Sequence, residues 1–185
     1  MARPQLIDRR AILGAAISIA DAHGLDAVTM SSVGAELGVS AMALYRYVDD
    51  KAALLDGMVE QLLTEVPLPP AEMAPLDRLE ALGDGLRSVA RAHPDAFPLL
   101  LGRPATTPDA RVRRDLVIEL LRDAGVPAGA RARLERLIST VVLGFAVSEV
   151  NGRFAGQSRS TIDRDWALLT RWLRELITDA GSISG

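Results

Sequence analysis

The chain has 185 residues, of which 49% are hydrophobic and 24% are charged, a composition typical of a folded domain rather than a disordered chain. Cysteine is absent, which excludes disulfides, thiolate metal sites and a cysteine nucleophile, and 2 histidines are too few for a histidine-rich metal site. The formal net charge is −3, so a polyanionic partner would have to be bound by a local arrangement of groups.

The first predicted element is an apolar stretch over residues 11–20 that follows Arg9 and Arg10. A basic pair before an apolar run also begins a secretion signal, which is the alternative interpretation. Apolar residues recur here with helical spacing, at Leu13, Ala16, Ile17 and Ala20. Because Gly24 follows where a helix usually ends, we interpret residues 9–23 as the first amphipathic helix of a cytoplasmic domain. No run of about 18 apolar residues predicts a membrane span.

The periodicity of the chain is helical, and the sequence predicts an all-α fold of about nine helices. Further helices in the first part are expected over residues 30–37, 41–47 and 51–65. The polar residues that precede these helices are expected to be their N-caps: Asp8, Thr29, Ser40 and Asp50. Gly38 is expected to supply a left-handed backbone conformation in the turn over residues 38–40.

A proline-rich linker divides the chain, with Pro67, Pro69, Pro70 and Pro75 in close succession. Beyond it, helices are expected over residues 76–93, shortly after Pro94, and over residues 108–124, 127–150 and 161–181. Thr107 and Thr161 are the expected N-caps of two of these helices, and Gly125 is expected to end one of them.

The segment from Thr29 to Lys51 is the most informative part of the sequence. Two short helices joined by a tight glycine turn are typical of a helix-turn-helix unit. The second helix is too short to fill a core, which suits an element that lies in the DNA major groove. Tyrosines beside Arg46 and Lys51 suit phosphate contacts, as do the free N–H groups at the start of the next helix. The alternative is that these residues form the solvated surface of an ordinary helical hairpin.

Short motifs over residues 8–65 carry a more specific signal. They are Ile12-Leu13-x-Ala15-Ala16, Gly24-Leu25, Val28-Thr29-Met30, Ala35-Glu36-Leu37-Gly38-Val39-Ser40, Leu44-Tyr45-Arg46-Tyr47-Val48 and Lys51-Ala52-Ala53-Leu54-Leu55. In their order and spacing these motifs resemble the DNA-binding domain of the tetracycline-repressor (TetR) family of bacterial transcription regulators. Over the rest of the chain the resemblance is architectural only, in length and in a helical second region.

The resemblance implies a DNA-binding surface on the second short helix and its neighbours. The residues expected to bind DNA are Thr29, Ser40, Ala41, Met42, Ala43, Tyr45, Arg46, Tyr47 and Lys51. Ser31 and Ser32 stand where many members of this family carry an arginine. Ala41 and Ala43 of the second short helix, which is expected to read the bases, cannot make bidentate hydrogen bonds to them. Arg46 is therefore the main candidate for a guanine contact. Residues 1–66 hold five basic and nine acidic residues, so non-specific DNA affinity should be weak.

The resemblance also implies a ligand pocket in the second region, with an apolar lining and few charges that would favour a small hydrophobic ligand. The expected lining residues are Leu86, Val89, His93, Phe97, Leu100, Leu101, Leu120, Val142, Phe145, Ser148 and Asn151. Arg111, Arg113 and Arg114 are expected to be a solvated helix start. The alternative is that the apolar residues fill the core and leave no cavity.

The last two helices are apolar on more than one face, which predicts a homodimer. The expected interface residues are Leu134, Val141, Trp166, Leu169, Leu173 and Leu176. The alternative is that both faces pack within one chain. We expect a helix-turn-helix domain over residues 1–50, a connecting helix over residues 51–66, and an all-α ligand-binding and dimerisation domain over residues 67–185.

The sequence thus predicts a cytoplasmic, ligand-responsive DNA-binding regulator: a homodimeric repressor released from a double-stranded palindromic operator by a small apolar molecule. No Gly-x-Ser-x-Gly, phosphate-binding glycine loop or His-x-x-x-His spacing occurs, so we expect no enzymatic activity, no cofactor and no metal. The alternative is a helical adaptor protein without DNA binding.

Overall fold

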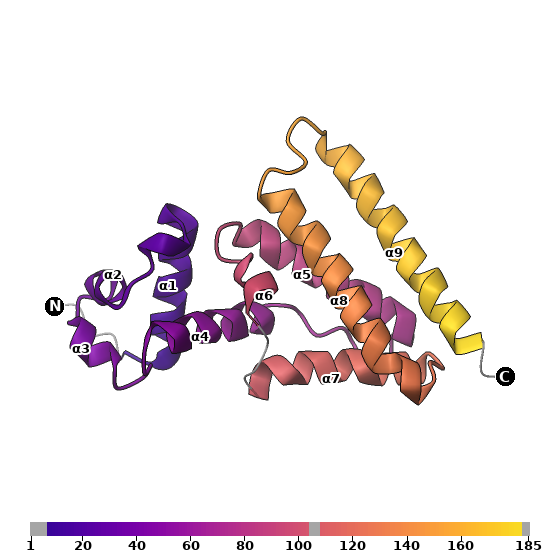
Figure 1. Cartoon of the computed structure of the whole chain (residues 1–185), viewed down its shortest axis with the longest axis horizontal. Coiled ribbons are helices and arrows are strands. Elements are labelled where there is room, and N and C mark those ends of the chain that lie inside the picture. The colour runs from indigo at the N-terminus through magenta and orange to yellow at the C-terminus, as the bar shows by residue number, and fades with distance from the viewer. Residues whose placement is uncertain (1–6, 104–107, 183–185) are drawn as a thin grey trace.

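The computed structural model describes residues 7–103 and 108–182, which form nine α-helices and one short 3-10 helix, without a strand among them (Figure 1). The predicted all-α fold is confirmed. Figure 1 shows α1 to α3 at one end of the molecule, α5 to α9 at the other, and α4 running between them. No helix in the described ranges is long and apolar enough to cross a membrane.

The first four helices begin close to where their capping residues predict. They are α1 (Arg9–His23), α2 (Met30–Glu36), α3 (Ala41–Leu44) and α4 (Lys51–Thr64), with a 3-10 helix at Leu25–Ala27. The Asp8 carboxylate accepts a hydrogen bond from the backbone N–H of Ala11 at 2.7 Å, and the Asp50 carboxylate accepts one from Ala53 at 2.7 Å. Each carboxylate satisfies an N–H group that the helix itself leaves unpaired, which fixes where the helix starts.

A reciprocal pair of side chains caps α2. The backbone N–H of Ser32 donates to the Thr29 hydroxyl at 3.0 Å, and the backbone N–H of Thr29 donates to the Ser32 hydroxyl at 2.9 Å. This capping box satisfies two donors at the start of the helix. Ser32 stands at a position where many members of the resembled family carry an arginine. In this chain the Ser32 side chain instead caps α2.

The turn between α2 and α3 depends on glycine at two positions. Gly38 has a φ of +70°, the left-handed region that side chains with a Cβ rarely adopt. A Cβ on Gly34 would lie 2.9 Å from the carbonyl oxygen of Val39, so α2 and the turn can approach this closely only without a side chain. The α2–α3 geometry therefore follows from local backbone constraints.

Helix α3 is shorter than the predicted span of residues 41–47. The backbone N–H groups of Tyr47 and Val48 both donate to the carbonyl of Leu44, so the chain leaves the α-helix in a tight turn. Ser40 stands at the N-cap position of α3, but its side chain makes no capping hydrogen bond among the described residues. The predicted capping by Ser40 is therefore wrong.

The second region holds the five remaining helices. They are α5 (Pro75–Ala92), α6 (Leu99–Gly102), α7 (Pro108–Asp123), α8 (Ala128–Val150) and α9 (Arg159–Ser182). Gly125 has a φ of +85° just after α7, as predicted. The predicted cap at Thr107 lies outside the described residues. Thr161 is not the cap of α9, because the helix begins at Arg159 and the Ser158 hydroxyl accepts from the backbone N–H of Thr161 at 3.2 Å.

The larger of two hydrophobic cores extends from α1 through α4 into the second region. Leu54, Met58 and Leu62 of α4 are fully buried in it, together with Ile12 of α1 and Phe97 before α6. A second, smaller core of Leu121, Val126, Leu134 and Ile177 joins α7, α8 and α9. Because interiors pack to near-crystalline density, α4 is held on both sides by apolar side chains.

A buried arginine joins α5, α8 and α9. The Arg87 Nε donates to Glu149 at 2.7 Å and an Nη donates to Asp163 at 2.7 Å, while its guanidinium lies 5.7 Å and 5.1 Å from the ring centres of Phe145 and Trp166. The carboxylates and aromatic faces together compensate the buried charge. This cluster fixes which faces of α8 and α9 point inward.

Substituting Gly34→Ala should destabilise the fold by roughly 1–3 kcal/mol, because the added methyl meets fixed backbone atoms. The matched control is Gly129→Ala in α8, where an added Cβ meets no atom within 4 Å. That control should be neutral or stabilising by up to about 1 kcal/mol. Urea unfolding followed by circular dichroism measures both, and equal stability of the two variants would contradict the packing argument.

Candidate nucleic-acid interface and ligand cavity

The α2–turn–α3 unit presents a polar and aromatic surface to solvent. Met42 is 75% exposed, Tyr45 46% and Tyr47 43%, and Arg46 is exposed beside them. Leu44, between these residues in the sequence, is fully buried and anchors α3 to the core. An exposed methionine and two exposed tyrosines on so short an element are unusual for a merely solvated face.

The structure places the sequence-predicted DNA-binding residues on this one surface or at its edges. Ser40, Met42, Tyr45, Arg46 and Tyr47 are exposed on or next to α3, with Ala41 and Ala43 half-buried among them. Thr29 is exposed at the start of α2 and Lys51 is exposed as the first residue of α4. Exposed Asp49 and Asp50 directly precede Lys51 and reduce the positive potential there.

A cavity of about 680 Å³ lies among α4, α5, α6, α7 and α8. This volume is within the range that drug-sized ligands occupy in proteins. The cavity is lined by Val59, Leu63, Leu86, Leu100, Leu101, Gly102, Arg103, Arg113, Arg114, Val117, Glu135, Arg136, Ser139 and Leu143. The space is open to solvent on one side, since Leu101 and Arg136 of its lining are exposed.

Three of the predicted lining residues, Leu86, Leu100 and Leu101, do line this cavity. The other predicted residues lie elsewhere: Val89, His93, Phe97, Leu120, Val142, Phe145, Ser148 and Asn151. Val89, Phe97 and Leu120 are buried in the core. Phe145 packs at a tilt against Phe154 and Trp166, with centroid distances of 5.2 Å each, on the side of α8 that faces α9. An apolar helix has two inward faces, and periodicity does not say which one lines a cavity.

The cavity is also more charged than predicted. Arg103, Arg113, Arg114 and Arg136 line it together with Glu135. Arg113 departs from the expected solvated helix start because it is partly buried, whereas Arg111 and Arg114 are exposed as expected. Nothing in the local sequence distinguishes an arginine facing a cavity from one facing water.

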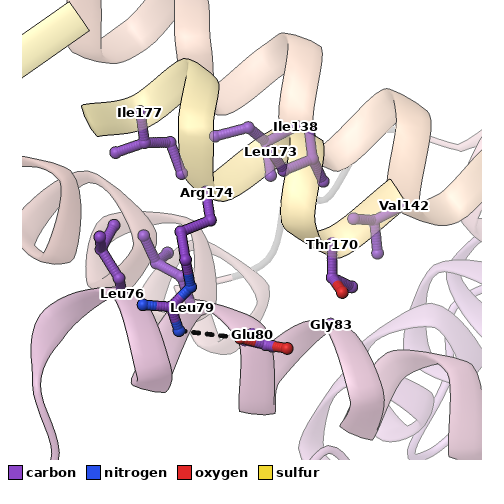
Figure 2. A pocket seen from close by; sticks show the side chains of 10 residues that line it. All are labelled: Leu76, Leu79, Glu80, Gly83, Ile138, Val142, Thr170, Leu173, Arg174 and Ile177. Carbon is purple, nitrogen blue, oxygen red and sulfur yellow. Dashed lines mark hydrogen bonds and ion pairs between the residues drawn. The ribbon is translucent and has the colours of Figure 1, made fainter. Parts of the chain in front are cut away.

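A second cavity, of about 40 Å³, lies between α5, α8 and α9 (Figure 2). Figure 2 shows Leu173 and Ile177 of α9 with Ile138 of α8 around this space, and Leu76 and Leu79 of α5 on the opposite side. The space is too small for a drug-sized molecule. The cavity near α7 is therefore the better candidate for a ligand.

The predicted dimer-interface residues on α8 and α9 differ in their exposure. Leu134 and Trp166 are buried within the chain, and the Trp166 indole donates to Asp84 at 2.6 Å. Leu173 lines the small cavity inside the chain, and Leu169 is half-buried. Val141 and Leu176 are exposed, as an interface requires.

Two further exposed residues, Leu137 and Trp172, were not predicted as interface residues; they are 51% and 58% exposed. Leu137 stands one helical turn before Val141, and Trp172 stands one turn before Leu176. That spacing could have identified both residues. The two helices pack against each other as a hairpin (Figure 1), and we call these four exposed side chains the apolar α8–α9 face.

His93 links the two parts of the molecule instead of lining the cavity. Its Nδ1 is 2.7 Å from Asp21 of α1 and its Nε2 is 2.9 Å from Glu65, the residue that follows α4. Burial opposes protonation of the ring, but the hydrogen bond to Asp21 and the charge of Glu65 outweigh it, and the pKa of His93 is raised above 6.5. The protonated ring donates to both carboxylates at once.

The docking of α1 against α5 should therefore be stronger at low pH. Because the pKa of His93 is higher in the folded state, His93 stabilises the fold fully below its unfolded pKa of about 6.5. This stabilisation is lost as the pH rises through the pKa of His93 in the folded state. His93→Gln should lower the melting temperature more near pH 6 than near pH 9. Exposed His23→Gln is the control and should show no such difference. A pH-independent effect of His93→Gln would contradict the bridge.

Comparison with known families supports the same interpretation of both regions. Residues 12–58 match the family described as bacterial regulatory proteins, tetR family, and residues 79–174 match the family described as tetracyclin repressor-like, C-terminal domain. A curated relative, the HTH-type transcriptional repressor DrrR1 of Streptomyces coeruleorubidus, is 31% identical over 157 residues, covering 84% of this chain. The chain spans 58% of the length of that relative.

Solved structures share the fold along the whole chain. ActR of Streptomyces coelicolor without ligand superposes with a TM-score of 0.85 at 22% identity, and 100% of each chain is covered. BioQ of Mycobacterium smegmatis superposes with a TM-score of 0.81 at 22% identity, covering 95% of this chain and 100% of BioQ. At these identities the likeness shows the fold.

Proposed function

Because the chain belongs to the TetR family of bacterial transcription regulators, we propose that it is a ligand-responsive repressor that binds a palindromic DNA operator. The observation that carries the proposal is the exposed surface of α3, held by a glycine turn and presenting Met42 and Arg46. The relatives support it by their names: DrrR1 is named a repressor, and structures are described of BioQ with its double-stranded DNA operator and of ActR with (S)-DNPA.

In the proposed complex α3 lies in the major groove. Arg46 is the side chain that can make a bidentate hydrogen bond to a guanine, and Met42 can contact a thymine methyl. Thr29, Tyr45 and Lys51 bind phosphates and set the position of the helix, with the N-terminal N–H groups of α4 beside them. Few side chains of α3 therefore contact bases. Specific recognition of an operator needs a second α3, supplied by a second copy of the chain.

We infer that the second copy is supplied by a homodimer formed through the apolar α8–α9 face. Leu137, Val141, Trp172 and Leu176 are exposed there, and an added Cβ on Gly144 of α8 would meet open space. Exposed apolar residues gathered on paired helices favour a four-helix contact across a two-fold axis. Two reading helices would then meet major grooves about 34 Å apart, or a multiple of that distance.

The domain division follows from the same assignment: residues 1–50 read DNA, residues 51–66 connect, and residues 67–185 bind the ligand and dimerise. Helix α4 begins at Lys51 on the DNA side, and its residues Val59 and Leu63 line the cavity. A ligand in the cavity touches the same helix that carries a phosphate contact. Coupling between two such sites is typically about 1–3 kcal/mol.

The relatives are named as regulators and not as enzymes, and we propose that this chain likewise has no catalytic activity. We place its action in the cytoplasm, where operator DNA is found in bacteria. A helical adaptor without DNA binding is the competing function. Selection from a random DNA pool separates the two, because an adaptor would enrich no palindromic site and would show no salt-dependent binding.

Arg46→Ala should weaken binding to the selected operator by roughly 1–3 kcal/mol and relax the preference at one base pair in each half-site. Lys51→Ala should instead weaken binding to all DNA sequences alike and reduce its salt dependence, because phosphates carry no sequence information. Gel-shift titration against the operator and its point variants measures both effects. An unchanged preference in Arg46→Ala would move that residue to the phosphate contacts.

Trp172→Asp should convert the dimer to a monomer, because an unpaired carboxylate at an apolar interface costs several kcal/mol. The monomer should keep its helical circular dichroism and lose operator binding. Val112→Asp is the control, since Val112 is 58% exposed on α7 and lies outside the α8–α9 face. Sedimentation velocity measures the oligomeric state, and a monomeric wild type at micromolar concentration would refute the interface.

A further inference from the structure

The cavity among α4 to α8 has an excess of positive charge. Four arginines line it, against one glutamate. Two of these arginines already have acidic partners: the Arg103 Nε donates to Asp56 at 2.7 Å, and the Arg114 Nε donates to Glu135 at 3.2 Å. The two remaining arginines of the lining are Arg113 and Arg136.

Arg113 is only partly satisfied. One of its Nη atoms donates to the carbonyl oxygen of Thr64 at 3.3 Å, and the other is buried with no hydrogen-bond partner. Burial lowers the pKa of Arg113, yet a guanidinium stays protonated at any physiological pH. A buried donor on a charged group that lacks a partner is costly, and the cost disappears when an anion binds it.

Arg136 of α8 is exposed, lines the same cavity and takes part in no ion pair among the described residues. The single acid of the lining, Glu135, is engaged by Arg114. Ser139 is also engaged, because its hydroxyl donates to the backbone carbonyl of Glu135 at 2.7 Å. The lining therefore offers unpaired cationic donors and apolar side chains, but few groups for sugar hydroxyls and none free for a cation.

We propose that the cavity binds an amphipathic organic carboxylate, with its apolar body against Leu86, Leu100 and Leu143 and its carboxylate on Arg113 and Arg136. The fork of N–H groups in a guanidinium matches the two oxygens of a carboxylate. This inference rests on the proposed function, in which the cavity is the effector site. It replaces the earlier expectation of an uncharged hydrophobic ligand.

The hydrogen bond between Arg113 and Thr64 connects the ligand cavity to the helix that carries Lys51. Thr64 is the last residue of α4, and Arg113 holds its carbonyl oxygen from α7. A carboxylate that draws the Arg113 guanidinium toward itself competes with that hydrogen bond. The end of α4 opposite Lys51 is then released from α7.

The test compares two probes of equal shape, anthracene carboxylate and anthracene carboxamide with the same ring position. Fluorescence titration measures the dissociation constant of each probe for wild type, Arg113→Gln and Arg122→Gln. Arg122 is the matched control because it lies on α7, is exposed and is absent from the cavity lining. Wild type should bind the carboxylate at least about tenfold more tightly than the carboxamide, since a hydrogen bond to a charged group is worth that much or more.

In Arg113→Gln this preference should largely disappear while carboxamide binding is unchanged, and Arg122→Gln should behave as wild type. Circular dichroism confirms folding of each variant, and Arg136→Gln provides the same comparison where Arg113→Gln does not fold. Equal binding of the two probes, binding of neither, or a preference that survives in both cavity variants would overturn the proposal. Operator selection by the unliganded wild type is scored separately, so failure of the regulator assignment is distinguishable from failure of the carboxylate site.

Discussion

The whole structure depends on the burial of α4 in a core that belongs to both ends of the chain. Leu54, Met58 and Leu62 are spaced one helical turn apart and fully buried, so one face of α4 is fixed in the core. Close-packed interiors transmit a displacement instead of absorbing it. Val59 and Leu63 line the cavity and α1 packs in the same core as α4, so a displacement of α4 would be passed on to α1.

The polar contacts between the second region and α1 or α4 are side-chain contacts that a ligand or a proton can alter. Arg103 donates to Asp56 and to the carbonyl of Ala52, Arg113 donates to Thr64, and His93 bridges Asp21 and Glu65. These groups fasten both ends of α4. Apolar packing and these charged contacts together hold the helix in the position that the structure shows. A regulator needs this combination, because coupling requires two arrangements that differ by only a few kcal/mol.

Short-range sequence patterns predicted where most helices begin, but not which side chains of different helices meet. Asp8, Thr29 and Asp50 act on groups within three residues, so the sequence alone located the starts of α1, α2 and α4. The end of α3 was misplaced because a turn competes there with the helix. The cavity and the interface depend on which of two apolar faces meets which neighbour. Phe145 and Trp166, predicted for the pocket and the interface, both lie beside the guanidinium of Arg87 in the structure.

The net negative charge of the N-terminal, DNA-binding part of the chain explains why a small coupling between the cavity and α3 is sufficient. Residues 1–66 carry five basic and nine acidic residues, and Asp49 and Asp50 stand beside Lys51. Electrostatic attraction to phosphate usually supplies most of the non-specific affinity for DNA, and we expect it to be small here because acidic residues outnumber basic ones. Operator binding in the proposed complex must then come from two correctly spaced reading helices. A protein that binds with little excess affinity is released by a small change in that spacing, so a coupling of about 1–3 kcal/mol decides between the bound and the free state.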